Sequence, residues 1–340
     1  MPGVVVVTGG SAGVGRATVE AFAGAGWDVG ILARGQERLD ATAASVRQRG
    51  RRACAIAADV ADAQAVERAA DDIERALGPI DVWVNNAMAT VFGAVSSLNA
   101  EEFRRGTEVT YLGQVHGTMA ALRRMRQRDR GTIVNIGSAL SYRAIPLQAV
   151  YCAAKYAARG FTDALRAEIL HDGLHVHLTM VHLAAMNTPQ FDWARNKTGH
   201  RAQPVPPIFA PEVAARAVLF AATHRRREVW VGFPTVKAIL ANKLAPGLLD
   251  HYLARNGYSG QLTPEPKPAD APDNLFDPAP GDWGAHGRFD ARERSGSWEL
   301  WTSRHRDGLV AALLAGAGVA LGSRLVKAAR TGTDRRTIRP

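Results

Sequence analysis

Short apolar, β-branched runs alternate with longer alanine-rich stretches along the first 235 residues. In the longer stretches, apolar residues recur three and four positions apart, which predicts amphipathic helices. Strands that alternate with helices form βαβ units, so the pattern predicts an α/β fold. We expect a doubly wound parallel sheet of about seven strands with helices on both faces. The predicted strands span residues 4–8, 29–33, 53–57, 80–85, 132–136, 176–181 and 228–231, and the clearest helices span 62–77, 101–127, 150–171 and 212–224.

Proline-rich stretches divide the rest of the chain. Residues 182–211 contain five prolines and no clear period, which predicts a long binding loop or lid. Residues 235–257 return to a helical pattern with a break at Pro246-Gly247. Residues 261–281 contain six prolines, as linkers and extended surface arms do, and both interpretations stay open. We therefore expect an α/β domain over residues 1–258, with its loop at about 182–211, and a Pro-rich arm over residues 259–305.

The C-terminal end of the sequence is first apolar and then basic. Residues 308–322 contain no charged side chain, and basic residues follow at positions 324, 327 and 330. We expect an apolar helix over residues 306–330 and a basic tail over residues 331–340. The 15 uncharged residues fall short of the ~20 that a membrane span needs. A span, a shallow membrane-associated helix at residues 308–330 and a protein interface therefore all stay open.

More than half of the net charge of +10 lies in residues 291–340, which hold ten Lys or Arg and four Asp or Glu. The body lacks interleaved basic and aromatic residues, so no nucleic-acid partner is expected. Cys54 and Cys152 are far apart and form no disulfide framework, which favours a reducing compartment. No secretory signal is apparent, and the histidines at 171, 175, 177 and 182 have no metal-ligand spacing. We expect a cytoplasmic protein without a metal.

A glycine-rich loop follows the first predicted strand and opens a helix. It reads Thr-Gly-Gly-Ser-Ala-Gly-Val-Gly over residues 8–15. Such a turn lets the backbone approach a pyrophosphate, which the free N–H groups of the helix N-terminus then bind. A glycine-rich turn without a ligand is the simpler alternative, but the strand before it and the helix after it favour a dinucleotide. The expected contacts are Gly9, Ser11, Gly13, Val14 and Gly15.

Tyr151 and Lys155 stand four residues apart, on one face of a predicted helix. Together with the glycine loop and Asn85-Asn86-Ala87, this pair resembles the short-chain dehydrogenase/reductase family over about residues 3–235. The resemblance implies a Rossmann-type fold, hydride transfer between a nicotinamide and a carbonyl or secondary alcohol, and a homodimer or homotetramer. The extended branch of the family, which includes sugar-nucleotide epimerases, would have glycine at position 12, where this chain has Ala12.

The same resemblance assigns the chemistry. Tyr151 would be the acid–base, and Lys155 would lower its pKa and bind the nicotinamide ribose. Ser138, at the end of the fifth predicted strand, would orient the substrate oxygen, with Ser141 as its local competitor. Thr110 stands where the family has an asparagine that anchors a proton relay to the lysine. A threonine hydroxyl can bond the carbonyl four residues earlier in its helix and still serve that relay.

The second predicted strand ends at Ala33-Arg34, where NAD-binding relatives have an acidic residue for the ribose hydroxyls. An arginine binds a 2′-phosphate that a carboxylate would repel, so we expect NADP(H) rather than NAD(H), with Arg34 as the main contact. An ordinary surface arginine is the alternative. The resemblance adds Asp59 and Val60 at the adenine, Asn85 and Ala87 along the cofactor, and Thr188 at the carboxamide.

The substrate is less defined by the sequence. Phe191, Trp193, Ile208 and Phe209 lie in the long loop and suggest an apolar pocket or lid, although loop packing would also explain them. Such a pocket would take an apolar small-molecule carbonyl or alcohol, for example a lipid, steroid or polyketide-like carbonyl. Two other functions stay open beside an NADP(H)-dependent reductase. One is a cofactor-binding sensor or scaffold without turnover, which the change at Thr110 would fit. The other is a sugar-nucleotide epimerase, which the glycine spacing disfavours.

Overall fold

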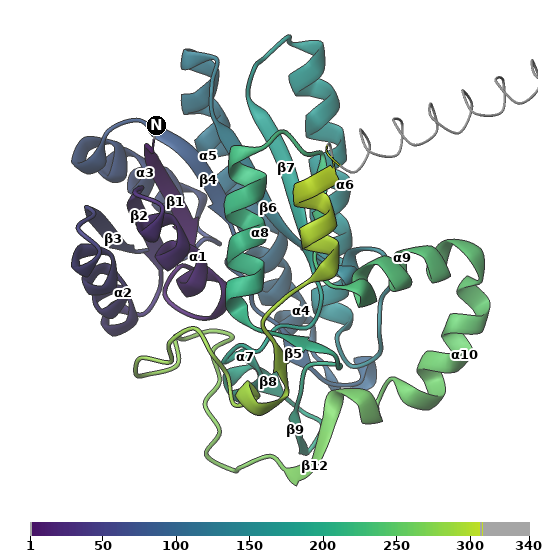
Figure 1. Cartoon of the computed structure of the whole chain (residues 1–340). Helices are drawn as coiled ribbons and strands as arrows, with labels where there is room; N and C mark the ends of the chain where they lie inside the picture. Colours follow the sequence, from purple (N-terminus) through teal and green to yellow (C-terminus); the bar gives the residue numbers. More distant parts are fainter. Residues whose placement is uncertain (1, 307, 309–340) are drawn as a thin grey trace, which may run out of the picture. The chain divides into compact units, whose positions relative to one another are not determined.

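A seven-stranded parallel sheet forms the centre of the computed structural model, which describes residues 2–306 and 308 (Figure 1). The strand order is β11-β7-β6-β4-β1-β2-β3, and every neighbouring pair is parallel. The order reverses at β1, so a crevice opens between the loops that follow β1 and β4. The strands are β1 (Val4–Thr8), β2 (Asp28–Ala33), β3 (Ala53–Ala57), β4 (Ile80–Asn85), β6 (Thr132–Ser138), β7 (His177–Leu183) and β11 (Glu228–Trp230).

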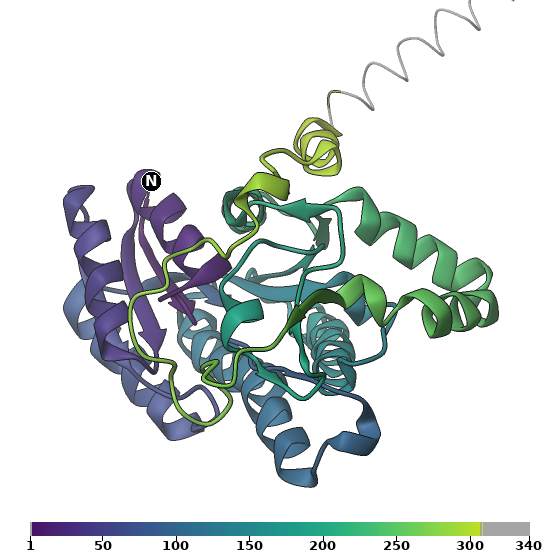
Figure 2. The same ribbon diagram turned by 90° about the horizontal axis from the view of Figure 1, so that it is seen from below.

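Helices cover both faces of the sheet, as Figures 1 and 2 show from two directions. Helices α1 and α8 pack together on one face, and α3 and α5 pack together on the other. The central strands are buried between these layers; β1, for example, is buried at every residue. The helices are α1 (Gly13–Gly24), α2 (Gln36–Gln48), α3 (Ala63–Leu77), α4 (Ala100–Thr107), α5 (Gly113–Arg128), α6 (Ala149–His171), α7 (Gln190–Trp193), α8 (Pro211–Thr223), α9 (Phe233–Leu244) and α10 (Pro246–Asn256).

All seven predicted strands are present, and the α/β fold is confirmed. The helix predicted over residues 101–127 is not continuous. A π-helical turn, Glu108–Leu112, separates α4 from α5. Such turns widen a helix locally and often occur at functional sites. No period in the sequence distinguishes this turn from an ordinary helix.

The Pro-rich arm packs on the long loop rather than standing apart as a linker. Strand β12 (Leu262–Pro266) pairs antiparallel with β9 (His200–Ala202), and β13 (Glu293–Arg294) pairs with β10 (Ile208–Phe209). The compact unit that contains the sheet accordingly extends to Ser297, and a second unit begins at Trp298. The remaining short strands are β5 (Val91–Phe92) and β8 (Arg195–Asn196).

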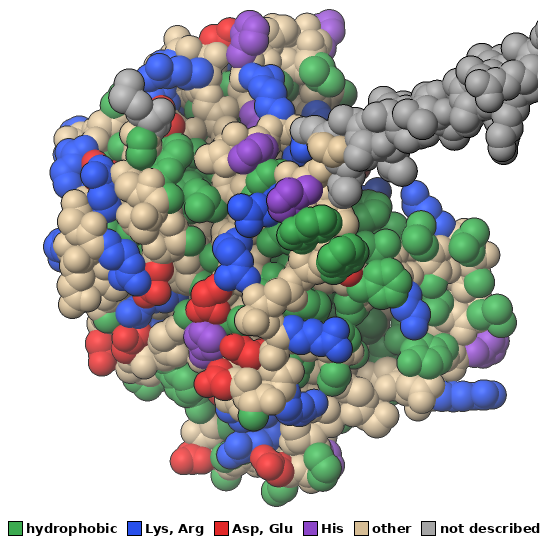
Figure 3. All heavy atoms as spheres, in the orientation of Figure 1, with side chains coloured by type: hydrophobic (Ala, Val, Ile, Leu, Met, Phe, Trp, Pro, Cys, Tyr) green, Lys and Arg blue, Asp and Glu red, His purple; other side chains and the backbone are tan. Residues whose placement is uncertain are grey.

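Helices α9 and α10 present apolar side chains to solvent, and hydrophobic atoms gather over them in Figure 3. The exposed side chains are Phe233, Leu240, Leu244, Leu248 and Tyr252. In the part of the chain that the structure describes, no helix is both long and apolar enough to span a bilayer. The helix and basic tail predicted from residue 306 onward lie outside the described residues, apart from Arg306 and Gly308.

Candidate functional site

A cavity of about 390 Å³ opens at the carboxyl edge of the sheet. The loops after β1, β4, β6 and β7 line it, together with α6 and the long loop. This is the edge at which doubly wound sheets bind ligands. The predicted site residues that line the cavity are Gly9, Ser11, Gly13, Val14, Gly15, Arg34, Asp59, Val60, Ala87, Ser138, Tyr151, Lys155 and Thr188.

The glycine loop has the geometry that a close backbone approach requires. Gly9 and Gly13 adopt φ angles of 63° and 55°, which side chains other than glycine rarely tolerate. A Cβ at Gly15 would lie 2.0 Å from the Gly9 carbonyl oxygen, so any side chain there would close the loop. Helix α1 begins at Gly13, and no side chain caps its N-terminus. The loop therefore offers backbone donors and a positive helix end to an anion.

The asparagine pair after β4 divides into two roles. Asn85 is fully buried and does not line the cavity; it bonds Thr118 and Asn135 within the structure. The following residue, Asn86, lines the cavity and donates to the carbonyls of Thr8 and Gly9. Asn85 thus stabilises the sheet from inside, while Asn86, which the sequence analysis did not single out, fixes the glycine loop. Asn86 was hard to select because the residue before it, Asn85, carries the same side chain.

Ser138, Tyr151 and Lys155 meet in one part of the cavity. The Lys155 nitrogen lies 5.6 Å from the centroid of the Tyr151 ring and donates to the Ile136 carbonyl at 2.6 Å. The Ser138 hydroxyl hydrogen-bonds the Tyr151 side chain. Ser141, the competing serine, is fully buried and accepts a hydrogen bond from the Ser138 backbone instead. The geometry therefore favours Ser138 as the hydroxyl that meets a substrate.

Burial is the largest influence on the pKa values of Tyr151 and Lys155. It raises the pKa of Tyr151, although the hydrogen bond from Ser138 lowers it. Burial also lowers the pKa of Lys155 to about 7. Desolvation of the phenolate is the largest influence on the tyrosine pKa, and the predicted lowering of that pKa by Lys155 stays a prediction. Tyr151 is therefore a protonated hydroxyl near neutral pH, and the Lys155 charge changes in the physiological range.

Replacing Lys155 by methionine should remove a pH-dependent cost of folding. Between pH 10 and pH 7 the unfolded lysine, with its ordinary pKa of 10.5, takes up a proton that the folded lysine does not. The wild-type chain therefore loses stability as the pH falls across this window, and Lys155→Met does not. The free energy of unfolding of the variant, minus that of the wild type, should rise by about 3 kcal/mol from pH 10 to pH 7.

Urea titrations at both pH values measure this difference. Lys243→Met, at an exposed lysine of α9, is the control and should give a difference independent of pH. A difference that is also flat for Lys155→Met would contradict a depressed lysine pKa.

Thr110 lies in the π-helical turn and does not line the cavity. Its hydroxyl donates to the Ala89 carbonyl at 2.7 Å and accepts from the Ala89 amide at 2.9 Å. The predicted bond to the carbonyl four residues earlier is not formed, because the hydroxyl reaches the loop after β4 instead. Both functions of the hydroxyl are thus used in joining the helix to that loop.

Thr110→Val should therefore lower the free energy of unfolding, while the folded variant should keep most of its turnover. Valine keeps the shape of threonine but leaves the buried Ala89 amide and carbonyl without a partner, at a cost of about 2–4 kcal/mol. Thr110→Ser retains the hydroxyl and should lose less than half as much. Urea unfolding measures both values. A Thr110→Val enzyme of wild-type stability whose turnover has collapsed would show instead that the hydroxyl serves a proton relay.

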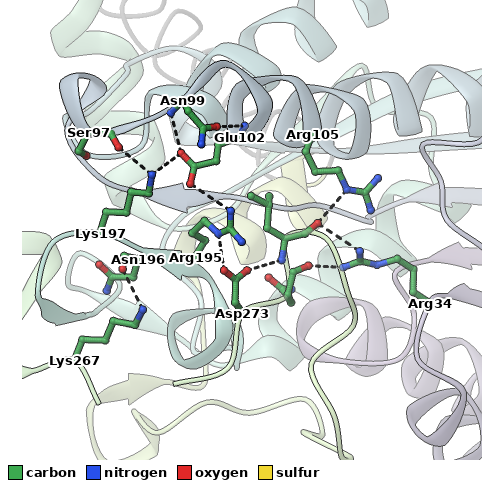
Figure 4. A network of polar contacts seen from close by, with 12 residues as sticks. Arg34, Ser97, Asn99, Glu102, Arg105, Arg195, Asn196, Lys197, Lys267 and Asp273 are labelled. Carbon is green, nitrogen blue, oxygen red and sulfur yellow. Dashed lines mark hydrogen bonds and ion pairs between the residues drawn. The ribbon is translucent and has the colours of Figure 1, made fainter. Parts of the chain in front are cut away.

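Three arginines lie at or beside the cavity; Arg34 and Arg38 line it, and Arg105 does not. The guanidinium of Arg34 donates to the carbonyls of Asn274, Leu275 and Phe276 in the arm, as Figure 4 shows in part. Arg105 donates to the Leu275 carbonyl at 3.0 Å and pairs with Asp59. Burial lowers the pKa of Arg34, and the Asp59 carboxylate opposes this shift.

Arg38 is the third arginine, and it lines the cavity beside Arg34. It stacks over Trp193, and its Nε is buried without a hydrogen-bond partner among the described residues. A guanidinium has five N–H donors, so Arg34 and Arg38 both keep donors for an anion. Sequence analysis missed Arg38 and Arg105 because their helical positions look like ordinary exposed charge.

Much of the remaining cavity lining is apolar. Phe191 and Trp193 line the cavity, as predicted, and Trp193 is the residue that Arg38 stacks on. Ile208 and Phe209 do not line it; both are buried in strand β10, which joins the loop to the arm. The other apolar side chains of the lining include Leu140, Ile145, Met186, Pro204, Val205, Pro206, Pro234 and Ala238.

Comparisons with known proteins agree with this geometry. The family model described as short chain dehydrogenase matches residues 3–198. An uncharacterised oxidoreductase of Bacillus subtilis, YxnA, is 30% identical over 276 residues, which cover 81% of this chain and 78% of that protein. The uncharacterised oxidoreductase Rv1543 of Mycobacterium tuberculosis is 31% identical over 252 residues, covering 73% of this chain and 71% of that one.

Solved structures show the same fold. An alcohol dehydrogenase of the archaeon Thermococcus sibiricus, complexed with 5-hydroxy-NADP, is 27% identical with a TM-score of 0.60, over 68% of this chain and 96% of that one. A short chain dehydrogenase/reductase of Burkholderia phymatum, in complex with NAD, has a TM-score of 0.65 at 23% identity, over 75% of this chain and 96% of that one. The two proteins bind different nicotinamide cofactors, so a preference in this chain must be argued from its own residues.

Proposed function

The chain belongs to the short chain dehydrogenase family and is an oxidoreductase, and from this we propose that it uses NADP(H) to interconvert an apolar carbonyl and its secondary alcohol. The observation that carries the proposal is that Ser138, Tyr151 and Lys155 line the same cavity as the glycine loop. The residues fit a dinucleotide on two counts. A Cβ at Gly15 would fill the loop, and Arg38 has a buried donor without a partner.

In this proposal a bound nicotinamide supplies or accepts the hydride, and the protein manages the proton. In the reducing direction the Tyr151 hydroxyl gives its proton to the carbonyl oxygen, which becomes the hydroxyl of the product. Ser138 holds that oxygen by a hydrogen bond. Burial keeps Tyr151 protonated and ready to donate. The Lys155 ammonium, 5.6 Å from the ring centroid, then stabilises the phenolate that remains.

The preference for NADP(H) rests on charge at the end of β2. Ala33 leaves no carboxylate to repel a 2′-phosphate, and Arg34 and Arg38 line the cavity with unused donors. The nearest acid in that part of the cavity, Asp59, is paired with Arg105. The local field therefore favours the additional phosphate of NADP(H).

Turnover separates this function from a cofactor-binding sensor or scaffold. Apolar aldehydes and ketones, small and large, are incubated with the full chain and NADPH or NADH, and absorbance at the nicotinamide band is followed. We expect carbonyl-dependent oxidation that is at least about tenfold faster with NADPH. Binding of NADPH without oxidation by any carbonyl would support the sensor, and tightly retained NAD without net oxidation would support an epimerase.

A further inference from the structure

The segment 273–287 of the arm, here named the strap, runs along the rim of the cofactor cleft. It passes the N-terminal elements drawn in purple in Figure 2 and contacts both the end of β2 and the start of α1. Leu275, near the beginning of the strap, is fully buried in the hydrophobic core cluster that packs on the sheet, and it anchors the strap there. Asn274 of the strap lines the cavity.

At the adenosine end, the strap presents its backbone to two arginines. Asp273 accepts a hydrogen bond from the Leu275 amide at 2.9 Å, which makes a tight turn, and it pairs with Arg195. This turn directs the Leu275 carbonyl toward Arg34 and Arg105 (Figure 4). Arg195 also pairs with Glu102, which is almost completely buried, so the turn is tied to the interior.

At the pyrophosphate end, the strap lies over the helix N-terminus. The Gly13 amide donates to the Gly284 carbonyl at 3.0 Å. Asp282 pairs with Arg16 at 2.9 Å and accepts from the Gly284 amide at 3.2 Å. On the other side of the same glycine, a Cβ at Gly13 would lie 3.3 Å from Thr188. The strap and the Thr188 loop therefore meet the glycine loop from two sides.

We propose that the strap is the outer wall of the nucleotide site, that Asp273 and Asp282 hold it closed, and that a bound dinucleotide leaves only when the strap opens. This inference rests on the proposed function and adds the determinant of cofactor retention. A dinucleotide in the cavity would have the strap along its rim, because the strap contacts Arg34 at one end and Gly13 of the glycine loop at the other. Breaking the contacts of Asp273 or Asp282 shortens the lifetime of the closed state and so raises the dissociation rate.

The test is the dissociation rate constant of NADPH, measured by displacing it from the full chain with excess NADP⁺ and following nicotinamide fluorescence. Asp273→Ala and Asp282→Ala should each raise this constant about fivefold to tenfold, the range for one charge-assisted contact. Asp270→Ala, at an exposed acid just before the strap, is the control and should match the wild type.

A second measurement needs no variant. Hydrogen exchange of residues 273–287 in the wild-type chain should slow when NADPH saturates the site. Dissociation rate constants within about twofold of the wild type for both variants, or exchange unchanged by NADPH, would overturn the role of the strap. Faster association of NADPH with an unchanged dissociation rate would also overturn it, because the strap would then compete with the cofactor. A chain that binds neither NADPH nor NADH would refute the proposed function itself.

Discussion

Tyr151→Phe is expected to lower kcat/KM for carbonyl reduction about 10³-fold, because the substitution removes only the hydroxyl that we propose as the proton donor. The phenylalanine ring fills the same space, so Lys155 and the cavity walls keep their positions. NADPH binding should change by less than about threefold, because the proposed contacts of the glycine loop and the arginines are untouched. Steady-state kinetics on a carbonyl that the wild type reduces, with NADPH binding followed by fluorescence, measure both effects.

Tyr156→Phe is the matched control for this variant. Tyr156 lies in the same helix five residues later, and 42% of its surface is exposed. It does not line the cavity, so its kinetics should match the wild type within about twofold. Turnover by Tyr151→Phe at more than a tenth of the wild-type rate would contradict the assignment of the proton donor.

Arg34→Ala should lower kcat/KM with NADPH about 100-fold and leave kcat/KM with NADH nearly unchanged. Hydrogen bonds to a charged group contribute about 1.5–3 kcal/mol, and a phosphate bound by a guanidinium lies at the upper end of that range. NADH has no 2′-phosphate, so kcat/KM with NADH should not change when the arginine is removed. Parallel titrations with the two cofactors give the ratio directly.

Arg34 also bonds the strap, so its variant needs a control for loosening of the arm. Asp273→Ala opens the same turn but keeps the arginine. It should weaken the binding of NADPH and the binding of NADH by similar factors, whereas Arg34→Ala should weaken the binding of NADPH alone. Equal losses for both cofactors in Arg34→Ala would show that the arginine is a structural anchor for the arm rather than a phosphate ligand.

Much of this molecule could be predicted because its signals are local. The apolar runs at β1 and β4 reflect strands covered on both faces, and that pattern is visible without any neighbour. Glycines at positions 9, 13 and 15 are required by backbone geometry, so their spacing alone indicates the loop. Tyr151 and Lys155 share a helix face, and their meeting follows from the helical period.

The features that escaped prediction depend on partners distant in the sequence. The π-helical turn at Thr110 is stabilised by Ala89, a residue of another loop. Arg38 can be recognised as a site residue only in the folded chain, where it lines the cavity and stacks over Trp193. The strap has a proline-rich composition typical of linkers, and only the bonds of its carbonyls to Arg34 and Arg105 reveal that it belongs to the site. Backbone carbonyls have no sequence signature at all.

If this chain transfers a hydride from NADPH to a carbonyl carbon, a deuterium label on the nicotinamide must appear in the alcohol. NADPH deuterated at either face of nicotinamide C4 is supplied with a carbonyl that the wild type consumes, and the alcohol is analysed by mass spectrometry. The account predicts one deuterium on the carbinol carbon from one face only, and none with Tyr151→Phe over the same time. NADPH consumption that leaves no deuterium in the alcohol from either face would contradict it.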